Sequence, residues 1–103
     1  MSRREKLQQL LHDDPDDPFL HYGLANEMLK DGDTREGIQV ITDVIERFPD
    51  YVAAYFRAGQ AMAEEGDNQA ARDVVTAGIA VARRVGNEHA AGEMTEFLQM
   101  LDG

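Results

Sequence analysis

Histidines and aspartates are the side chains of this chain best suited to binding a metal ion or transferring a proton. The three histidines are His12, His21 and His89, and their separation matches no metal-binding motif. The acidic run at 13–18 has the carboxylates of a calcium loop, but it lacks the central glycine and closing glutamate of an EF-hand. Its two prolines also restrict the backbone. We therefore expect no metal site there, but a helix–helix turn with aspartate N-caps.

Other catalytic groups are equally sparse. The carboxylate pairs Glu64–Glu65 and Glu93–Glu96 fall on expected amphipathic helices, where such pairs normally face water. Ser2 and the four threonines lie near no base, and the chain has no glycine-rich phosphate loop and no cysteine. The five methionines occur at helical spacing and are interpreted as core residues. The sequence predicts neither an enzyme nor a protein that binds a metal or cofactor.

The charge of the chain restricts its partners. Twenty acidic and ten basic residues give a formal net charge of -10. This sign argues against nucleic acids and anionic membranes, because proteins bind both through Lys and Arg. The amino-terminal sequence is polar, unlike a signal peptide, and no stretch approaches the roughly 20 apolar residues that span a bilayer. We therefore expect a cytoplasmic protein.

The elements that carry these residues have a helical apolar pattern. Apolar residues recur at spacings of three and four, with proline and glycine at the ends of each run. We expect Gly32 and Gly66 to adopt left-handed C-caps between helices. No segment alternates with period two, so the predicted fold is all-α. The expected helices span residues 3–12, 19–30, 34–48, 51–65, 69–85 and 88–101.

The chain matches itself when it is shifted by 34 residues. The tripeptide at 31–33 (Asp-Gly-Asp) falls on 65–67 (Glu-Gly-Asp), and Tyr22 falls on Phe56. Upstream, the dipeptide Pro15–Asp16 falls on a second Pro-Asp dipeptide. A fixed period of about 34 residues is typical of helix–turn–helix repeats, which form arrays that usually bind other macromolecules.

These matches resemble the tetratricopeptide repeat (TPR) family, and specifically a small bacterial-type TPR protein. The family pairs two antiparallel helices per repeat, and small residues such as Ala25 and Gly59 let the helices touch. Arg83 stands where the family has proline, which suggests that the array closes there. The resemblance implies one antiparallel helix-pair solenoid of about six helices over 1–103. Its parts are a half repeat at 3–17, repeats at 18–51 and 52–85, and a capping helix at 86–103.

The resemblance also implies a binding surface. TPR arrays line a concave groove with the first helix of each repeat, and an aromatic residue with an amide four positions later occurs there in both repeats. An aromatic ring supplies contact area, and an amide can hydrogen-bond a peptide backbone. The predicted partner-binding residues are Tyr22, Asn26, Lys30, Phe56, Arg57 and Gln60. The alternative interpretation is that Tyr22 and Phe56 pack against flanking helices, including the last one.

Two functions are compatible with the resemblance. The first is a non-catalytic interaction module that binds a peptide or helix of another protein, with Lys30 and Arg57 favouring an acidic or C-terminal segment. The carboxylate clamp of some family members is broken, because Tyr22 and Arg57 replace its lysine and an asparagine. The second is a scaffold whose terminal helices pair two copies of the chain as a homodimer. Its apolar residues are Leu7, Leu10, Leu11, Leu98, Met100 and Leu101.

The acidic composition yields a prediction about salt. The chain has two lysines against eight arginines, and eleven of its acids are aspartate, a bias that fits adaptation to high salt. In that case the melting temperature should rise steeply between low and molar salt, because salt screens the repulsion among carboxylates. Thermal melts followed by circular dichroism measure this. An unchanged melting temperature would leave only the interpretation of a well-solvated surface.

Overall fold

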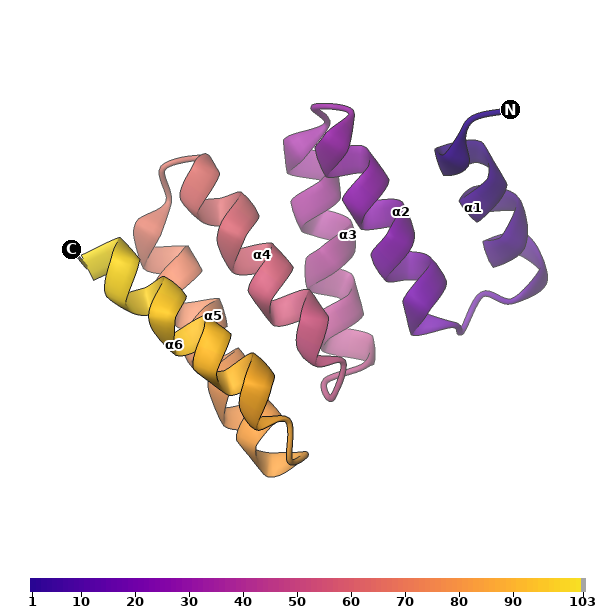
Figure 1. Cartoon of the computed structure of the whole chain (residues 1–103). Coiled ribbons are helices and arrows are strands. Elements are labelled where there is room, and N and C mark those ends of the chain that lie inside the picture. Colours follow the sequence, from indigo (N-terminus) through magenta and orange to yellow (C-terminus); the bar gives the residue numbers. More distant parts are fainter. Residues whose placement is uncertain (103) are drawn as a thin grey trace. The chain divides into compact units, whose positions relative to one another are not determined.

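The computed structural model describes residues 1–102, and within them it contains six α-helices and no strand (Figure 1). The all-α prediction is confirmed, and no helix end differs from its expected position by more than one residue. None of these helices is long and apolar enough to cross a membrane. The helices are α1 (Arg3–Asp13), α2 (Pro18–Lys30), α3 (Thr34–Arg47), α4 (Val52–Glu64), α5 (Asn68–Arg84) and α6 (Glu88–Asp102).

Three glycines end α2, α4 and α5 in the same way. Gly32, Gly66 and Gly86 have positive φ angles of 89°, 83° and 83°, which side chains with a Cβ rarely adopt. The amide after each glycine donates to a carbonyl five residues earlier, as from Asp33 to Met28 at 2.9 Å. The two predicted left-handed caps are confirmed. Gly86 also ends α5 about one turn beyond Arg83, which stands at the family's proline position.

The chain divides into two compact units, Met1–Phe48 and the part that begins at Pro49. In the first unit, α1 and α3 each pack against α2. Its buried core contains Leu7, Leu24 and Met28, covered by partly buried apolar side chains. The helices of the α2–α3 pair approach closely at Gly37, where a Cβ would lie 2.7 Å from Cδ2 of Leu29.

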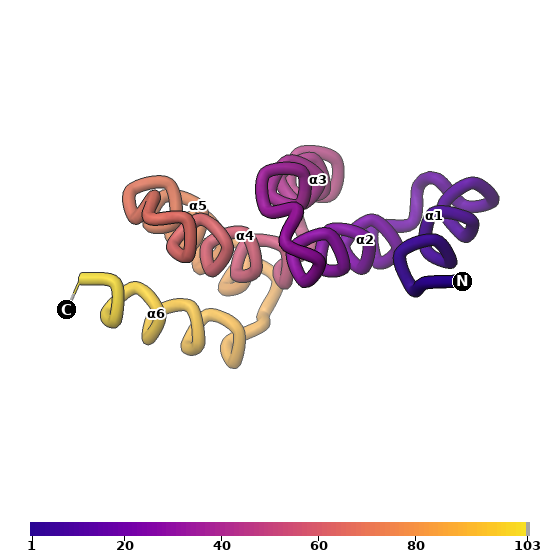
Figure 2. The backbone as a smooth tube through the Cα atoms, turned by 90° about the horizontal axis from the view of Figure 1, so that it is seen from above, coloured from indigo at the N-terminus to yellow at the C-terminus, as the bar shows by residue number. Residues whose placement is uncertain are grey.

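In the second unit, α4 and α6 both pack against α5, and α6 runs alongside the α4–α5 pair (Figure 2). A Cβ on Gly59 would overlap Cγ2 of Val75. The backbone of α4 at this glycine therefore lies directly against a side chain of α5. A Cβ on Gly78 would lie 2.8 Å from the sulfur of Met94, which is fully buried. The core of this unit therefore depends on small residues that let three helices approach one another.

The two units share an equivalent polar contact, at the start of α2 in the first unit and of α4 in the second. His21 Nε2 lies 2.6 Å from the carbonyl oxygen of Pro15, and the Tyr55 hydroxyl donates to the carbonyl oxygen of Pro49 at 2.7 Å. The two rings stand at equivalent places of the 34-residue repeat. The ring of His21 also lies 6.3 Å from the ring of Phe48, measured between centroids. An aromatic residue with a polar tip thus anchors each helix to the turn before it.

An arginine at the end of the second paired helix reinforces the same turn. Arg47 bonds Asp16 at 2.8 Å in the first unit, and Arg84 bonds Asp50 at 2.5 Å in the second. The hydrogen bond from Arg84 lowers the pKa of the Asp50 carboxyl below its ordinary value. All four side chains are largely exposed, so we assign these ion pairs a role in geometry rather than a large stabilisation.

Two glycine-to-alanine substitutions, one at a close helix contact and one in open space, should change the free energy of unfolding in opposite directions. Gly59→Ala should lower the free energy of unfolding by about 1–3 kcal/mol, because its Cβ overlaps Val75. Gly92 is an exposed residue of α6, and a Cβ added to it would have no atom within 4 Å. There, Gly92→Ala should raise that free energy by roughly 0.5–1 kcal/mol, because alanine restricts the unfolded chain.

Urea denaturation of both variants and the parent measures the two changes. Equal stability of Gly59→Ala and the parent would show that α4 and α5 are not in contact at this position.

Candidate functional site

Three of the predicted binding residues lie on α2 in the first unit. Tyr22, Asn26 and Lys30 are four residues apart, so they share one face of the helix. Tyr22 and Asn26 are half-buried, whereas Lys30 is exposed at the carboxyl end of α2. Phe19 precedes them on the same helix and is 61% exposed. This face therefore combines accessible aromatic surface, an amide and one positive charge that the helix dipole favours.

The other three predicted residues lie on α4 in the second unit. Phe56 and Gln60 are four apart and share a helix face, with Arg57 next to Phe56 in the chain. All three side chains are half-buried. The predicted set is thus divided between two units, with three residues on the first paired helix of each.

Phe56 and Gln60 line a hollow of about 280 Å³ between α4 and α6. The ring of Phe56 meets the ring of Phe97 edge-on, at 5.6 Å between centroids and 69° between planes. Phe56 therefore does pack against the last helix, as the alternative interpretation had it, and it also lines this open hollow. The four lining residues that the sequence-based prediction missed are Glu93, Glu96, Phe97 and Met100.

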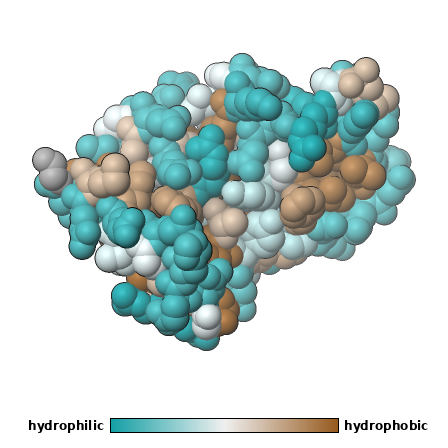
Figure 3. All heavy atoms as spheres, viewed as in Figure 1, coloured by the Kyte–Doolittle hydropathy of each residue, from teal (hydrophilic) through white to brown (hydrophobic). Residues whose placement is uncertain are grey.

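The interpretation of all five methionines as core residues is wrong for two of them. Met28 and Met94 are buried, but Met1 is 72% exposed and Met100 is 78% exposed. Met100 follows Met94 on α6, but it lines the hollow at the surface instead of the core. Figure 3 shows tan and brown apolar atoms near the carboxyl end of α6, surrounded by hydrophilic ones. Met100 thus adds accessible apolar surface to the hollow.

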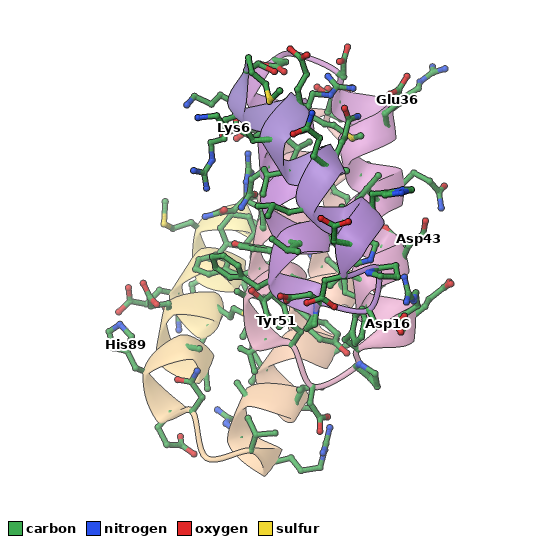
Figure 4. All side chains as sticks on the ribbon, turned by 90° about the vertical axis from the view of Figure 1, so that its right-hand side faces the viewer. Lys6, Asp16, Glu36, Asp43, Tyr51 and His89 are labelled. Carbon is green, nitrogen blue, oxygen red and sulfur yellow. The ribbon has the colours of Figure 1, made fainter. Side chains whose placement is uncertain are left out.

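The border of this hollow is acidic. The side chains of Glu93 and Glu96 are exposed, as expected for a solvated face, but they stand beside the apolar rings. Within residues 1–102, the ion pair of Glu93 is with His89 at 3.4 Å, and that of Asp102 is with Arg72 at 2.9 Å. His89 projects outward from α6 (Figure 4) and is charged only when protonated. The last turn of α6 has no basic residue. Little positive charge therefore balances these carboxylates.

A second hollow, of about 370 Å³, lies in the first unit among α1, α2 and α3. Its floor is apolar, and Arg47 at its border is occupied by Asp16 and the carbonyl of Pro15. Within residues 1–102, no three histidine or carboxylate side chains are grouped in a way that could hold a metal ion. The arrangements found in both units are suited to holding apolar side chains of another molecule.

A pattern in the sequence could have indicated the missed residues. Glu93, Phe97 and Met100 follow at spacings of four and three, so they share one face of a helix. Glu93 was interpreted as part of a solvated surface, and Phe97 was not among the predicted binding residues. Only the packing of α6 against α5 shows that this face borders α4.

The chain is similar to proteins of known sequence and known structure. No family model matches it. A TPR repeat-containing protein of Pseudomonas aeruginosa is 33% identical over 98 residues, which cover 95% of this chain and 93% of that protein. The solution structure of a tetratricopeptide repeat domain protein from Salinibacter ruber is 30% identical with a TM-score of 0.83, covering 86% of this chain and 90% of that one.

The fold is also shared with a more distant structure. PcrH, solved in complex with the chaperone binding region of PopD, is 18% identical with a TM-score of 0.86, covering 96% of this chain and 75% of that one. At this identity the likeness establishes the fold alone. The 34-residue period, the glycine-capped antiparallel helix pairs and the Pseudomonas aeruginosa relative agree with one another. The chain belongs to the tetratricopeptide repeat family.

Proposed function

We propose that the chain is a non-catalytic interaction module that binds a peptide or helix of another protein. The observation that carries this proposal is the open hollow between α4 and α6, where the predicted residues Phe56 and Gln60 lie. The hollow of about 280 Å³ lies at the lower end of the sizes of small-molecule pockets, roughly 300–1,000 Å³. It is large enough to receive a side chain or two from a protein partner.

The lining of the hollow supports protein recognition. Two aromatic rings offer rigid contact area at a low cost in conformational entropy, and Gln60 can both donate and accept hydrogen bonds. PcrH shares the fold, and its solved complex contains the chaperone binding region of PopD. A protein of this architecture can therefore hold a segment of another protein.

The face of α2 is proposed to contribute to the same function. Tyr22, Asn26 and Lys30 repeat the aromatic–amide spacing of α4, and exposed Phe19 extends their apolar area. Such combinations of aromatic and polar side chains are typical of residues that dominate binding energy at interfaces.

The alternative proposal is self-assembly through the terminal helices. Leu10 of α1 is 52% exposed and Met100 of α6 is 78% exposed, so each terminal helix presents an apolar side chain to solvent. Sedimentation of the full chain distinguishes the two proposals. A monomer at high concentration supports the interaction module, whereas a dimer dispersed by Leu10→Ser or Met100→Ser supports self-assembly.

The test is a selection of peptides on the immobilised full chain from a displayed random library, followed by calorimetric titration of a selected peptide. Gln60→Ala should weaken binding by about 1 kcal/mol or more, roughly fivefold, with an unchanged melting temperature. Phe56→Ala should weaken both binding and folding, because it also removes the contact with Phe97.

The matched controls are Gln39→Ala and Asp73→Ala, on exposed positions of α3 and α5. Their affinity should equal that of the parent. A library that yields no binding peptide would contradict the proposal, as would a peptide whose affinity falls only in the two controls.

A further inference from the structure

The chemistry of the α4–α6 hollow restricts the partner beyond the proposal above. Its apolar part consists of Phe56, Phe97 and Met100, and its border carries Glu93 and Glu96. The two carboxylates are three residues apart on α6, so they stand on neighbouring turns of one face. A bound segment would therefore meet apolar surface and negative charge together.

The apolar part is accessible. Met100 is 78% exposed, although a methionine normally gains stability by burial. Its unbranched, polarisable side chain adapts to partners of different shape. Phe56 and Phe97 meet edge to face, and both rings are partly exposed and line the hollow. The hollow can thus accommodate one bulky apolar side chain of a partner.

The charge around the α4–α6 hollow is negative. Glu96 has no ion-pair partner within residues 1–102, and Glu93 is balanced only when His89 is protonated. The carboxyl end of α6 adds the negative pole of its helix dipole, and its last turn has no basic residue. The whole chain has a formal net charge of -10, which attracts cationic partners over a longer range.

We infer that the α4–α6 hollow binds a basic segment of another protein. A bulky apolar side chain of that segment lies against Phe56, Phe97 and Met100, and Lys or Arg beside it pairs with Glu93 and Glu96. This inference rests on the proposed interaction function. The acidic partner expected from the sequence depended on Lys30 and Arg57, and neither residue lines the hollow.

Another copy of the chain is the competing occupant. On α1, Lys6 and Leu10 are four residues apart, and Lys6 points away from the helix into solvent (Figure 4). Leu10 is exposed, so α1 offers the same combination of charge and apolar surface on a small scale. The experiment must therefore separate a foreign segment from self-association.

The experiment repeats the selection from the displayed random library on three forms of the full chain. The parent is compared with Glu93→Lys/Glu96→Lys and with Glu65→Lys/Asp73→Lys, which makes the same change in net charge at exposed positions outside the hollow. The parent and the control should enrich peptides that combine Lys or Arg with a bulky apolar residue. The hollow variant should lose this preference and enrich acidic peptides.

Titration of a peptide selected on the parent makes the effect quantitative. Glu93→Lys/Glu96→Lys should weaken its binding about tenfold or more, since two exposed ion pairs become repulsive. Met100→Ser should weaken binding about threefold or more with an unchanged melting temperature, because Met100 is exposed. The Glu65→Lys/Asp73→Lys control should change affinity less than about twofold, because salt screens surface charges that are remote from the peptide.

Three outcomes would overturn the inference. Peptides selected on the parent that are neutral or acidic, or that bind the hollow variant equally well, would refute the basic partner while leaving the proposed function standing. A failure to select any peptide would contradict both. Self-association of the parent that disappears in Glu93→Lys/Glu96→Lys would identify a second copy of the chain as the occupant.

Discussion

The close approach of paired helices at glycine is the constraint on which both units depend. Gly37 lies against Leu29 in the first unit, and Gly59 and Gly78 lie against Val75 and Tyr55 in the second. Because no Cβ separates the helices there, side chains of the neighbouring helix fill the space directly. The second unit in particular has a core rich in alanine, which supplies little apolar area per residue. Close packing therefore has to provide the stabilisation that burial of large side chains provides in other protein cores.

This packing also decides which surfaces remain available. α5 packs against α4 at Gly59. Phe56 and Gln60 of α4 instead border α6 and the open hollow. α6 packs through Met94 against Gly78, and Glu93, Glu96 and Met100 of the same helix line the hollow. The chemistry of the hollow is thus a consequence of helix pairing. It consists of apolar surface with nearby charge, which suits recognition of a protein segment.

The helices and turns could be predicted because their signals are local. Proline at the start of α2 and glycine after α2 and α4 specify ends through backbone geometry alone. Two of the six residues that line the hollow, Phe56 and Gln60, were among the predicted binding residues, because they repeat a pattern found on α2. Phe97 and Met100 were missed because the side on which α6 packs depends on Gly78, which is distant in the chain. Periodicity shows that a helix has an apolar face, but not which neighbour covers it.

The central claim is that a basic, apolar segment binds in the α4–α6 hollow. Its most direct test is a nuclear Overhauser experiment on the complex with a selected peptide, using methyl-labelled methionine. The account predicts contacts between the Met100 methyl group and the apolar side chain of the peptide, together with contacts to the rings of Phe56 and Phe97. Contacts confined to other surfaces, such as exposed Val85 beyond the end of α5, would contradict it.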